Sequence, residues 1–258
     1  MAVLQVNGAQ LYYEEHCACA GERALVLAHG MGGNHAIWFK QLPALTQHFR
    51  VISFDHRGFG NSSDPQGLGR SAYVDDLKAL VDALQLQRVA LVGQSMGGGT
   101  CISFACNYPE RVSALVVADS LHALEESADI AAIMDAARTR TRNLSQLERV
   151  LGERVRTQDP LAAVLYRQIN SFNAVNRHNL AGEFRRFAPA RLAATGIPVL
   201  FIAGTEDVLF PIEAIRLMQR QLTGSQLVEI ANTGHSAFYE SPDEFNAALL
   251  AALIPRDY

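Results

Sequence analysis

The chain has 258 residues, of which 49% are hydrophobic and 19% charged, a balance typical of a globular protein rather than a disordered one. Its net charge of −4 at pH 7 provides no overall basic field, which argues against a nucleic-acid partner. The N-terminus lacks the basic and apolar regions of a signal peptide, and no apolar run reaches the roughly 18 residues of a membrane span. We therefore expect a cytoplasmic protein that neither spans a membrane nor binds nucleic acid.

The chain opens with a predicted β-hairpin, Val3–Val6 and Gln10–Glu15, joined by the turn dipeptide Asn7-Gly8. Short apolar runs rich in Val, Leu and Ile follow, most of them succeeded by a turn and a helical pattern. Runs that are apolar on both faces are typical of parallel strands covered by helices. The sequence therefore predicts a doubly wound, mostly parallel α/β sheet that begins with an antiparallel hairpin. The predicted parallel strands are Ala24–Ala28, Val51–Phe54, Val89–Val92, Ala114–Ala118, Val199–Ala203 and Leu227–Ile230.

Four helices are predicted around this sheet. Ser71 is interpreted as the N-cap of a helix whose apolar residues begin at Val74, and Met96–Tyr108 is apolar nearly all round, which predicts a buried helix. Glu213–Leu222 and Pro242–Leu253 show amphipathic patterns.

The stretch between Leu121 and Gly196 contains no strand-like run. It predicts an all-helical insertion, 121–196, between two halves of an α/β core, 1–120 and 197–258. The insertion has eleven arginines and eight acidic residues, so it carries +3 while the remainder carries −7. Its helical patterns are Glu125–Thr141, Ser145–Arg156, Pro160–Ser171 and Val175–Phe187.

The four cysteines predict neither a metal site nor a redox pair. Cys17 and Cys19 are too close for a C-x-x-C motif, and no His/Cys cluster has zinc spacing. Cys101 and Cys106 lie in the apolar helical pattern after residue 95 and are expected in the core. Free thiols without a signal peptide favour a reducing cytoplasm.

Ser95 is the candidate nucleophile. It is the centre of a G-x-S-x-G motif, Gly93 to Gly97, placed between a predicted strand and a predicted helix. A sharp strand-to-helix turn exposes the hydroxyl at the carboxyl end of the strand and sets the N–H of Met96 at a helix N-terminus. A Ser that only caps the helix is the structural alternative.

His235 is the candidate base, because a serine hydroxyl needs a positioned base near neutral pH. Among eight histidines, only His235 follows the last predicted strand. Loops after parallel strands gather at one sheet edge, which predicts that His235 lies beside Ser95.

Two carboxylates compete as the acid that would orient His235. Asp207 follows the strand 199–203 and fits the order Ser–Asp–His, and Asp119 follows the strand 114–118. We favour Asp207, with Asp119 as the alternative acid and Glu206 as a weaker third choice.

The loop His29-Gly30-Met31-Gly32-Gly33 follows the strand 24–28 and is predicted to point backbone N–H groups into the site. The N–H groups of Met31 and Met96 would then form an oxyanion hole. His29 is interpreted as a structural residue of this loop. The glycines match neither a dinucleotide fingerprint nor a P-loop, so no cofactor and no metal are expected.

Five motifs in this order resemble those of the α/β-hydrolase superfamily. They are His29-Gly30-x-Gly32-Gly33, Asp55-x-Arg57-Gly58-x-Gly60-x-Ser62, Gly93-x-Ser95-x-Gly97-Gly98, Gly204-x-x-Asp207-x-x-x-Pro211 and Gly234-His235. The chain is similar to 3-oxoadipate enol-lactone hydrolases, to cofactor-free haloperoxidase-like esterases and to ring-cleavage C–C hydrolases. The resemblance implies that 121–196 is a cap over the site and that the Asp55 segment braces a loop. Ser rather than Asp at the nucleophile position argues against dehalogenation and epoxide opening.

The leading functional hypothesis is hydrolysis of a small ester or lactone through an acyl-enzyme on Ser95. C–C bond hydrolysis of a ring-cleavage product, with the same three residues, is the second hypothesis. A slow-turnover ligand receptor of the same fold is the third. The basic insertion could favour an anionic substrate, but we favour the interpretation that its arginines are solvated and paired, as Arg149 with Glu153.

Overall fold

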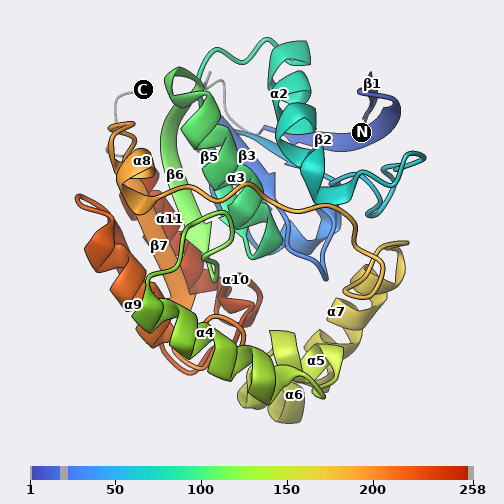
Figure 1. Cartoon of the computed structure of the whole chain (residues 1–258). Coiled ribbons are helices and arrows are strands. Elements are labelled where there is room, and N and C mark those ends of the chain that lie inside the picture. Colours follow the sequence, from blue (N-terminus) through green and yellow to red (C-terminus); the bar gives the residue numbers. More distant parts are fainter. Residues whose placement is uncertain (1, 18–22, 255–258) are drawn as a thin grey trace.

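An eight-stranded sheet with strand order β1-β2-β4-β3-β5-β6-β7-β8 forms the centre of the protein (Figure 1). The structure, a computed structural model, describes residues 2–17 and 23–254. The strands β1 and β2 pair antiparallel with each other, β2 pairs antiparallel with β4, and all other neighbours are parallel. The predicted mixed sheet is therefore confirmed. The strands are β1 (Ala2–Val6), β2 (Ala9–His16), β3 (Ala24–Ala28), β4 (Arg50–Phe54), β5 (Val89–Gln94), β6 (Val112–Ala118), β7 (Val199–Gly204) and β8 (Gln226–Ile230).

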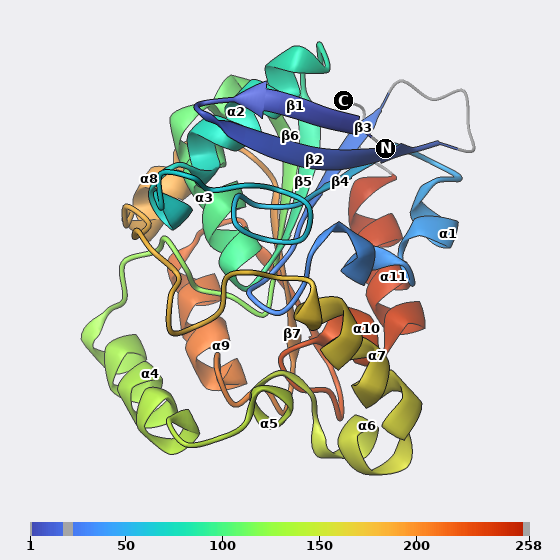
Figure 2. The same ribbon diagram turned by 90° about the vertical axis from the view of Figure 1, so that its right-hand side faces the viewer.

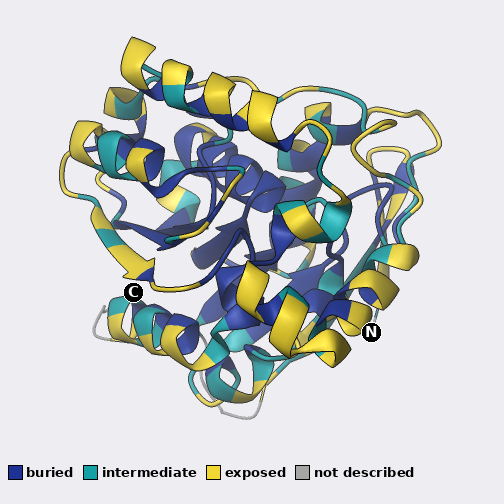
Figure 3. Ribbon diagram, turned by 90° about the horizontal axis from the view of Figure 1, so that it is seen from below, coloured by how far each residue is buried: buried dark blue, intermediate teal, exposed yellow. Residues whose placement is uncertain are grey.

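Helices cover both faces of the sheet, as Figure 2 shows with the sheet nearly edge-on. One face is covered by α2 (Tyr73–Ala83), α3 (Met96–Asn107), α8 (Pro189–Ala193) and α9 (Ile212–Gln221). The other is covered by the 3-10 helix η1 (His35–Trp38) with α1 (Leu42–Leu45), α10 (Ala237–Glu240) and α11 (Pro242–Leu253). The strands β3, β5, β6 and β7 are buried along their whole length because both faces are covered, and exposed residues lie on outer helix surfaces, in loops and on the edge strand β8 (Figure 3).

The segment 121–196 connects β6 to β7 and carries α4 (Ala128–Thr141), α5 (Gln146–Val150), α6 (Glu153–Gln158) and α7 (Pro160–Ser171). Figures 1 and 2 both place these four helices beyond one end of the sheet, opposite the end where the two chain termini lie. The connection β6–α4 leaves the carboxyl end of β6, so the helices gather at the edge where ligands of parallel sheets bind.

Three predictions about helices were wrong. Ser71 lies in the 3-10 helix η2 (Gly69–Ser71), and Ala72, which offers no side-chain cap, precedes α2. The predicted helix Ser145–Arg156 is divided into α5 and α6, because Leu151 is extended and Gly152 is packed against Glu240 and Gly234. A side chain at Gly152 would collide with these neighbours.

The third wrong prediction is the helix Val175–Phe187, which is irregular apart from one bridge of Phe187 with Leu124. Gly182 has a φ of +71°, outside the helical region. Val175, Leu180 and Phe184 pack individually onto a small cluster around Phe59, Tyr73 and Met96, so their burial does not require helical periodicity.

Cys101 and Cys106 are buried in α3, as predicted, and Cys17 is exposed. Cys19 lies outside the described residues. Within residues 2–17 and 23–254, no helix has the length and apolar character needed to cross a membrane.

Candidate active site

Ser95 lies at the sharp turn between β5 and α3. Its φ of 50° and ψ of −117° are rare for a residue with a side chain, a strain typical of a nucleophile at a strand–helix turn. The turn is anchored because Ser95 N donates to Ala118 O (2.9 Å) and Ser120 Oγ donates to Ser95 O (2.7 Å). Gly97 is required because a Cβ there would collide with the carbonyl of Ala28.

His235 contacts Asp207, and both side chains are buried. The imidazole Nδ1 lies 2.9 Å from Asp207 Oδ2, and the two side chains are 4% and 0% exposed. Asp207 Oδ1 accepts from the backbone N–H groups of Leu209 (2.7 Å) and Phe210 (3.1 Å), which fixes the carboxylate. The Phe210 ring stacks on the imidazole at 5.7 Å and 15°. His235 Nε2 is therefore the ring nitrogen left for a reacting group.

Ser95 and His235 line the same cavity. The two segments are joined by Gln94 Nε2, which donates to the carbonyl of His235 (2.8 Å). Among the described residues the Ser95 hydroxyl makes no hydrogen bond within 3.5 Å, so Ser95 and His235 are neighbours of one cavity rather than a bonded pair. Contacts of this kind are commonly loose in the absence of substrate.

Asp119 is buried but faces the backbone rather than His235. Its Oδ1 accepts from Gly204 N (2.8 Å) and its Oδ2 from Ala237 N (3.3 Å), so it ties the ends of β6 and β7 to the His235 loop. Burial and the nearby charge of Asp207 raise the pKa of Asp119 well above its usual range. Glu206, the third candidate acid, has an exposed side chain. Of the three carboxylates, Asp207 is the one in contact with His235.

The loop after β3 approaches Ser95 closely at Gly30, where a Cβ would lie 3.0 Å from Ser95 Cβ. Met31, the next residue, lines the cavity. In the part of the chain that is described, neither Met31 N–H nor Met96 N–H donates to a protein acceptor. Both are therefore available to a ligand, and Met96 N–H lies at the positive end of α3.

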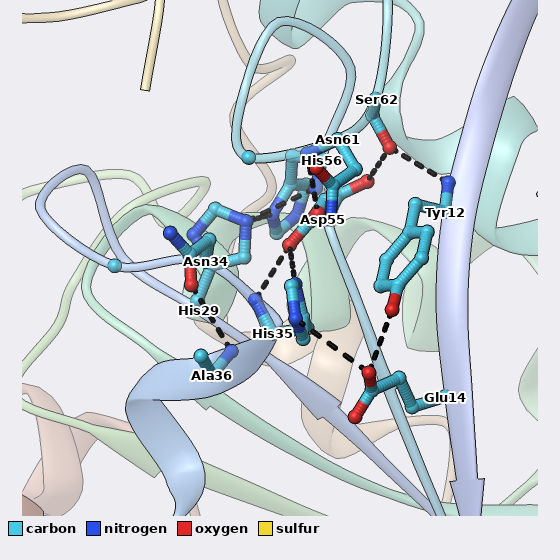
Figure 4. Close-up of polar contacts among 12 residues, drawn as sticks. Tyr12, Glu14, His29, Asn34, His35, Ala36, Asp55, His56, Asn61 and Ser62 are labelled. Carbon is cyan, nitrogen blue, oxygen red and sulfur yellow. Dashed lines mark hydrogen bonds and ion pairs between the residues drawn. The ribbon is translucent and has the colours of Figure 1, made fainter. Parts of the chain in front are cut away.

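A polar network behind this loop holds it in place (Figure 4). Asp55 Oδ1 accepts from both the backbone N (2.6 Å) and the ring Nδ1 (2.8 Å) of His35, and Asp55 Oδ2 accepts from Asn61 N (2.8 Å). His35 Nε2 lies 3.8 Å from Glu14 Oε1. Burial lowers the pKa of His35, but the hydrogen bond and charge of Asp55, together with Glu14, raise it overall. This arrangement agrees with a loop-bracing role for the Asp55 segment.

His29 lies beside this network and does not line the cavity. Its Nε2 accepts from His56 N (3.0 Å), and its Nδ1 lies 2.8 Å from the carbonyl oxygen of Gly30 (Figure 4). Burial lowers the pKa of His29 to about 4 and that of His56 well below its usual value, so both are neutral at pH 7. A structural role for His29 follows.

Sequence patterns gave no sign of the role of Glu240, which is buried in α10. Glu240 Oε1 accepts from Gly234 N (3.0 Å), and Oε2 accepts from Gly152 N (3.0 Å). One carboxylate thus links the residue before His235 to the junction of α5 and α6. Burial raises the pKa of Glu240 to about 7, against the opposing effect of these hydrogen bonds.

The cavity has a volume of about 580 Å³, and 17 of its 25 lining residues come from the segment 121–196. Its walls combine apolar groups such as Leu121, Met134 and Phe184 with several arginines. A cavity of this size, with a few polar groups converging on it, suits a small organic ligand. No cluster of His, Cys, Asp and Glu that could hold a metal ion occurs within the described ranges.

Comparisons with known proteins agree with this fold. A family model described as the alpha/beta hydrolase fold matches residues 23–146 and 129–242. The "Putative carbamate hydrolase RutD" of Caulobacter sp. (strain K31) is 31% identical over 261 residues, which cover 93% of this chain and 94% of that protein.

Solved structures of similar size superpose over nearly the whole chain. A hydrolase from Pseudomonas aeruginosa PA01 is 29% identical, with a TM-score of 0.79 and coverage of 98% of this chain and 97% of that one. A thermophilic esterase from Thermogutta terrifontis, solved with malate bound, is 26% identical, with a TM-score of 0.79 and coverage of 98% and 96%. The chain belongs to the α/β-hydrolase superfamily and is a hydrolase of that fold.

Proposed function

We propose that the protein is a serine hydrolase that cleaves a small carboxylic ester or lactone through an acyl-enzyme on Ser95. The observation that carries the proposal is the 2.9 Å contact of His235 with the buried Asp207, because His235 lines the same cavity as Ser95. His235 is assigned as general base and Asp207 as the carboxylate that fixes its tautomer and stabilises the imidazolium.

In the acylation step, the Ser95 Oγ forms a bond to the carbonyl carbon of the ester while His235 Nε2 takes the hydroxyl proton. The carbonyl oxygen becomes an oxyanion, and we assign its stabilisation to the N–H groups of Met31 and Met96. Collapse of this intermediate breaks the bond to the alkoxy oxygen, which receives the proton from His235 and leaves as an alcohol. For a lactone, that alcohol stays attached to the acyl group.

In the deacylation step, a water molecule gives a proton to His235 Nε2 and attacks the acyl-enzyme carbonyl. The bond from that carbonyl to Ser95 Oγ breaks, Ser95 recovers its proton, and a carboxylic acid is released. Neither step uses a metal or a redox group, which fits the absence of cofactor motifs in the sequence.

The segment 121–196 is assigned as a cap domain on the α/β core of 1–120 and 197–258. It supplies most of the cavity lining, so it would exclude water and select the substrate. The proposed partner is consequently a small molecule rather than a polymer. We place the reaction in the cytoplasm.

Carbamate hydrolysis is a second candidate, favoured by the name given to the relative that is 31% identical. A carbamate presents a carbonyl carbon to Ser95, as an ester does, and the same proton transfers would cleave it. The amide-like resonance of a carbamate makes its carbonyl a weaker electrophile, so the two classes differ in intrinsic reactivity rather than in the residues required.

The test is a substrate panel of esters, lactones, carbamates and vinylogous 1,5-diketones, measured with wild type and Ser95→Ala. The proposal is supported if wild type turns over esters or lactones repeatedly and Ser95→Ala does not. Turnover confined to carbamates selects the second candidate, and turnover confined to the diketones selects C–C hydrolysis. A single turnover per protein molecule would instead indicate a ligand receptor.

A further inference from the structure

The charged residues around the cavity are unbalanced. The lining contains six arginines but only two glutamates. Glu126 accepts from Arg138 (2.8 Å), so one acid and one base are already paired. The remaining five arginines share the cavity with one carboxylate, Glu183. They are Arg70, Arg142, Arg149, Arg177 and Arg186.

Three of these arginines gather at the carboxyl end of α4. Arg149 Nη1 donates to the carbonyl of Thr141 (2.9 Å), and Arg177 Nη1 donates to the carbonyl of Arg142, the next residue (3.5 Å). The three come from different parts of the cap, since Arg142 follows α4, Arg149 is in α5 and Arg177 lies between α7 and α8. Tertiary folding therefore brings these positive charges together.

The cluster lacks a carboxylate counter-ion. In residues 2–17 and 23–254, no Asp or Glu oxygen lies within 4.0 Å of the side-chain nitrogens of Arg142, Arg149 or Arg177. The pairing of Arg149 with Glu153, which we favoured from the sequence, is not formed. Arg149 is half-buried, and burial together with the charge of Arg177 lowers its pKa. Arg142 and Arg177 are exposed, so the cost falls on Arg149, because a half-buried cation beside another cation is unfavourable without an anion nearby.

We propose that Arg142, Arg149 and Arg177 form an anion subsite that binds a carboxylate group carried by the substrate. The inference rests on the proposed function, because it describes a second group on the molecule that Ser95 attacks. Each guanidinium has five N–H donors in a planar fork, and Arg149 uses one of them on Thr141. The remaining donors suit a planar carboxylate, which accepts two parallel hydrogen bonds from one arginine.

The neighbouring arginines of α4 provide a contrast. Arg138 is paired with both Glu126 and Asp135, as expected for a solvated helix face. Arg140 is exposed and does not line the cavity. Arg140 is therefore a matched control, because it lies two residues from Arg142 and its replacement removes the same charge from the same cap.

Direct binding is the first test. Isothermal titration measures the affinity of glutarate, a small dicarboxylate, for wild type, Arg149→Gln, Arg177→Gln and Arg140→Gln. We expect each cluster variant to weaken binding by about tenfold or more, the size of one charge-assisted hydrogen bond, and Arg140→Gln to change it less than about twofold. Arg177 is exposed, so its variant covers the case in which Arg149→Gln fails to fold.

Kinetics is the second test. The kcat/KM of mono-p-nitrophenyl glutarate is compared with that of neutral p-nitrophenyl butyrate in the same four proteins. We expect wild type to prefer the anionic ester, and this preference to shrink as added salt screens the charges. The preference should fall in Arg149→Gln and Arg177→Gln and be retained in Arg140→Gln.

The inference is overturned if glutarate does not bind wild type, or if Arg140→Gln weakens binding as much as the cluster variants do. An unchanged ester preference in Arg149→Gln and Arg177→Gln also overturns it. If glutarate binding depends on these arginines but neither ester is turned over, the proposed function is refuted. The anion subsite is then still supported.

Discussion

Asp207 touches the imidazole of His235, with 2.9 Å between Oδ2 and Nδ1, whereas both oxygens of Asp119 accept backbone N–H groups. We expect Asp207→Asn to lower kcat by about 10³-fold to 10⁴-fold, because an amide cannot fix the required tautomer. Asp119→Asn replaces one acceptor oxygen by a donor that faces a backbone N–H. It should mainly lower the free energy of unfolding, by about 1–3 kcal/mol.

Kinetics at saturating substrate and urea unfolding of both variants measure the two effects separately. If Asp119→Asn is the more damaged enzyme while keeping its stability, Asp119 is the orienting acid and the assignment of Asp207 is wrong.

Ser95→Ala should abolish repeated turnover, with kcat reduced by about 10³-fold to 10⁶-fold, while the protein stays folded. Removing the hydroxyl leaves the turn intact, because its anchors are the backbone N and O of Ser95. A fluorophosphonate should add once to wild type, at Ser95, as measured by intact mass and peptide mapping. The exposed Ser171→Ala serves as control and should label normally. Labelling at another serine, or undiminished activity in Ser95→Ala, contradicts the mechanism.

The sequence predicted the sheet well, because a strand covered by helices on both faces is a continuous apolar run in the sequence. The strand β6, with every residue from Val112 to Ala118 buried, is an example. The turn at Ser95 was equally predictable from the G-x-S-x-G motif, since only glycines fit at Gly93 and Gly97, where a Cβ would meet backbone atoms. The contact of His235 with Asp207 followed from the rule that parallel strands end at one edge.

The cap was predicted less well because its conformation depends on contacts distant in sequence. The break at Gly152 exists because Glu240 and Gly234 approach its backbone, and no local pattern in the chain records that approach. The irregular path of 175–187 likewise depends on Phe184 packing beside Tyr73 and Met96. The clustering of Arg149 with Arg177 could not be predicted from their spacing, since 27 residues of mixed structure separate them.

Glu240 leads to a prediction about stability and pH. Its carboxyl has a pKa of about 7 in the folded protein, against 4.5 as the reference value for an accessible glutamate. The folded state therefore holds the proton more tightly than the unfolded state does. Between about pH 4.5 and pH 7 the unfolded chain has lost this proton and the folded chain has not, so the free energy of unfolding falls as pH rises. Above pH 7 both states are ionised and this contribution becomes constant.

The variant Glu240→Gln cannot ionise and isolates the effect. Its amide retains one acceptor for Gly234 N or Gly152 N but loses the other, a loss of stability that does not itself vary with pH. Relative to wild type, however, it should gain about 3 kcal/mol as pH rises from 4.5 to 7, the linkage value for a shift of this size. Urea unfolding at several pH values measures the difference, and the exposed Glu244→Gln should leave the wild-type pH dependence in place. A stability difference between wild type and Glu240→Gln that does not vary over this range would mean that Glu240 is ionised throughout, and that its two backbone hydrogen bonds outweigh its burial.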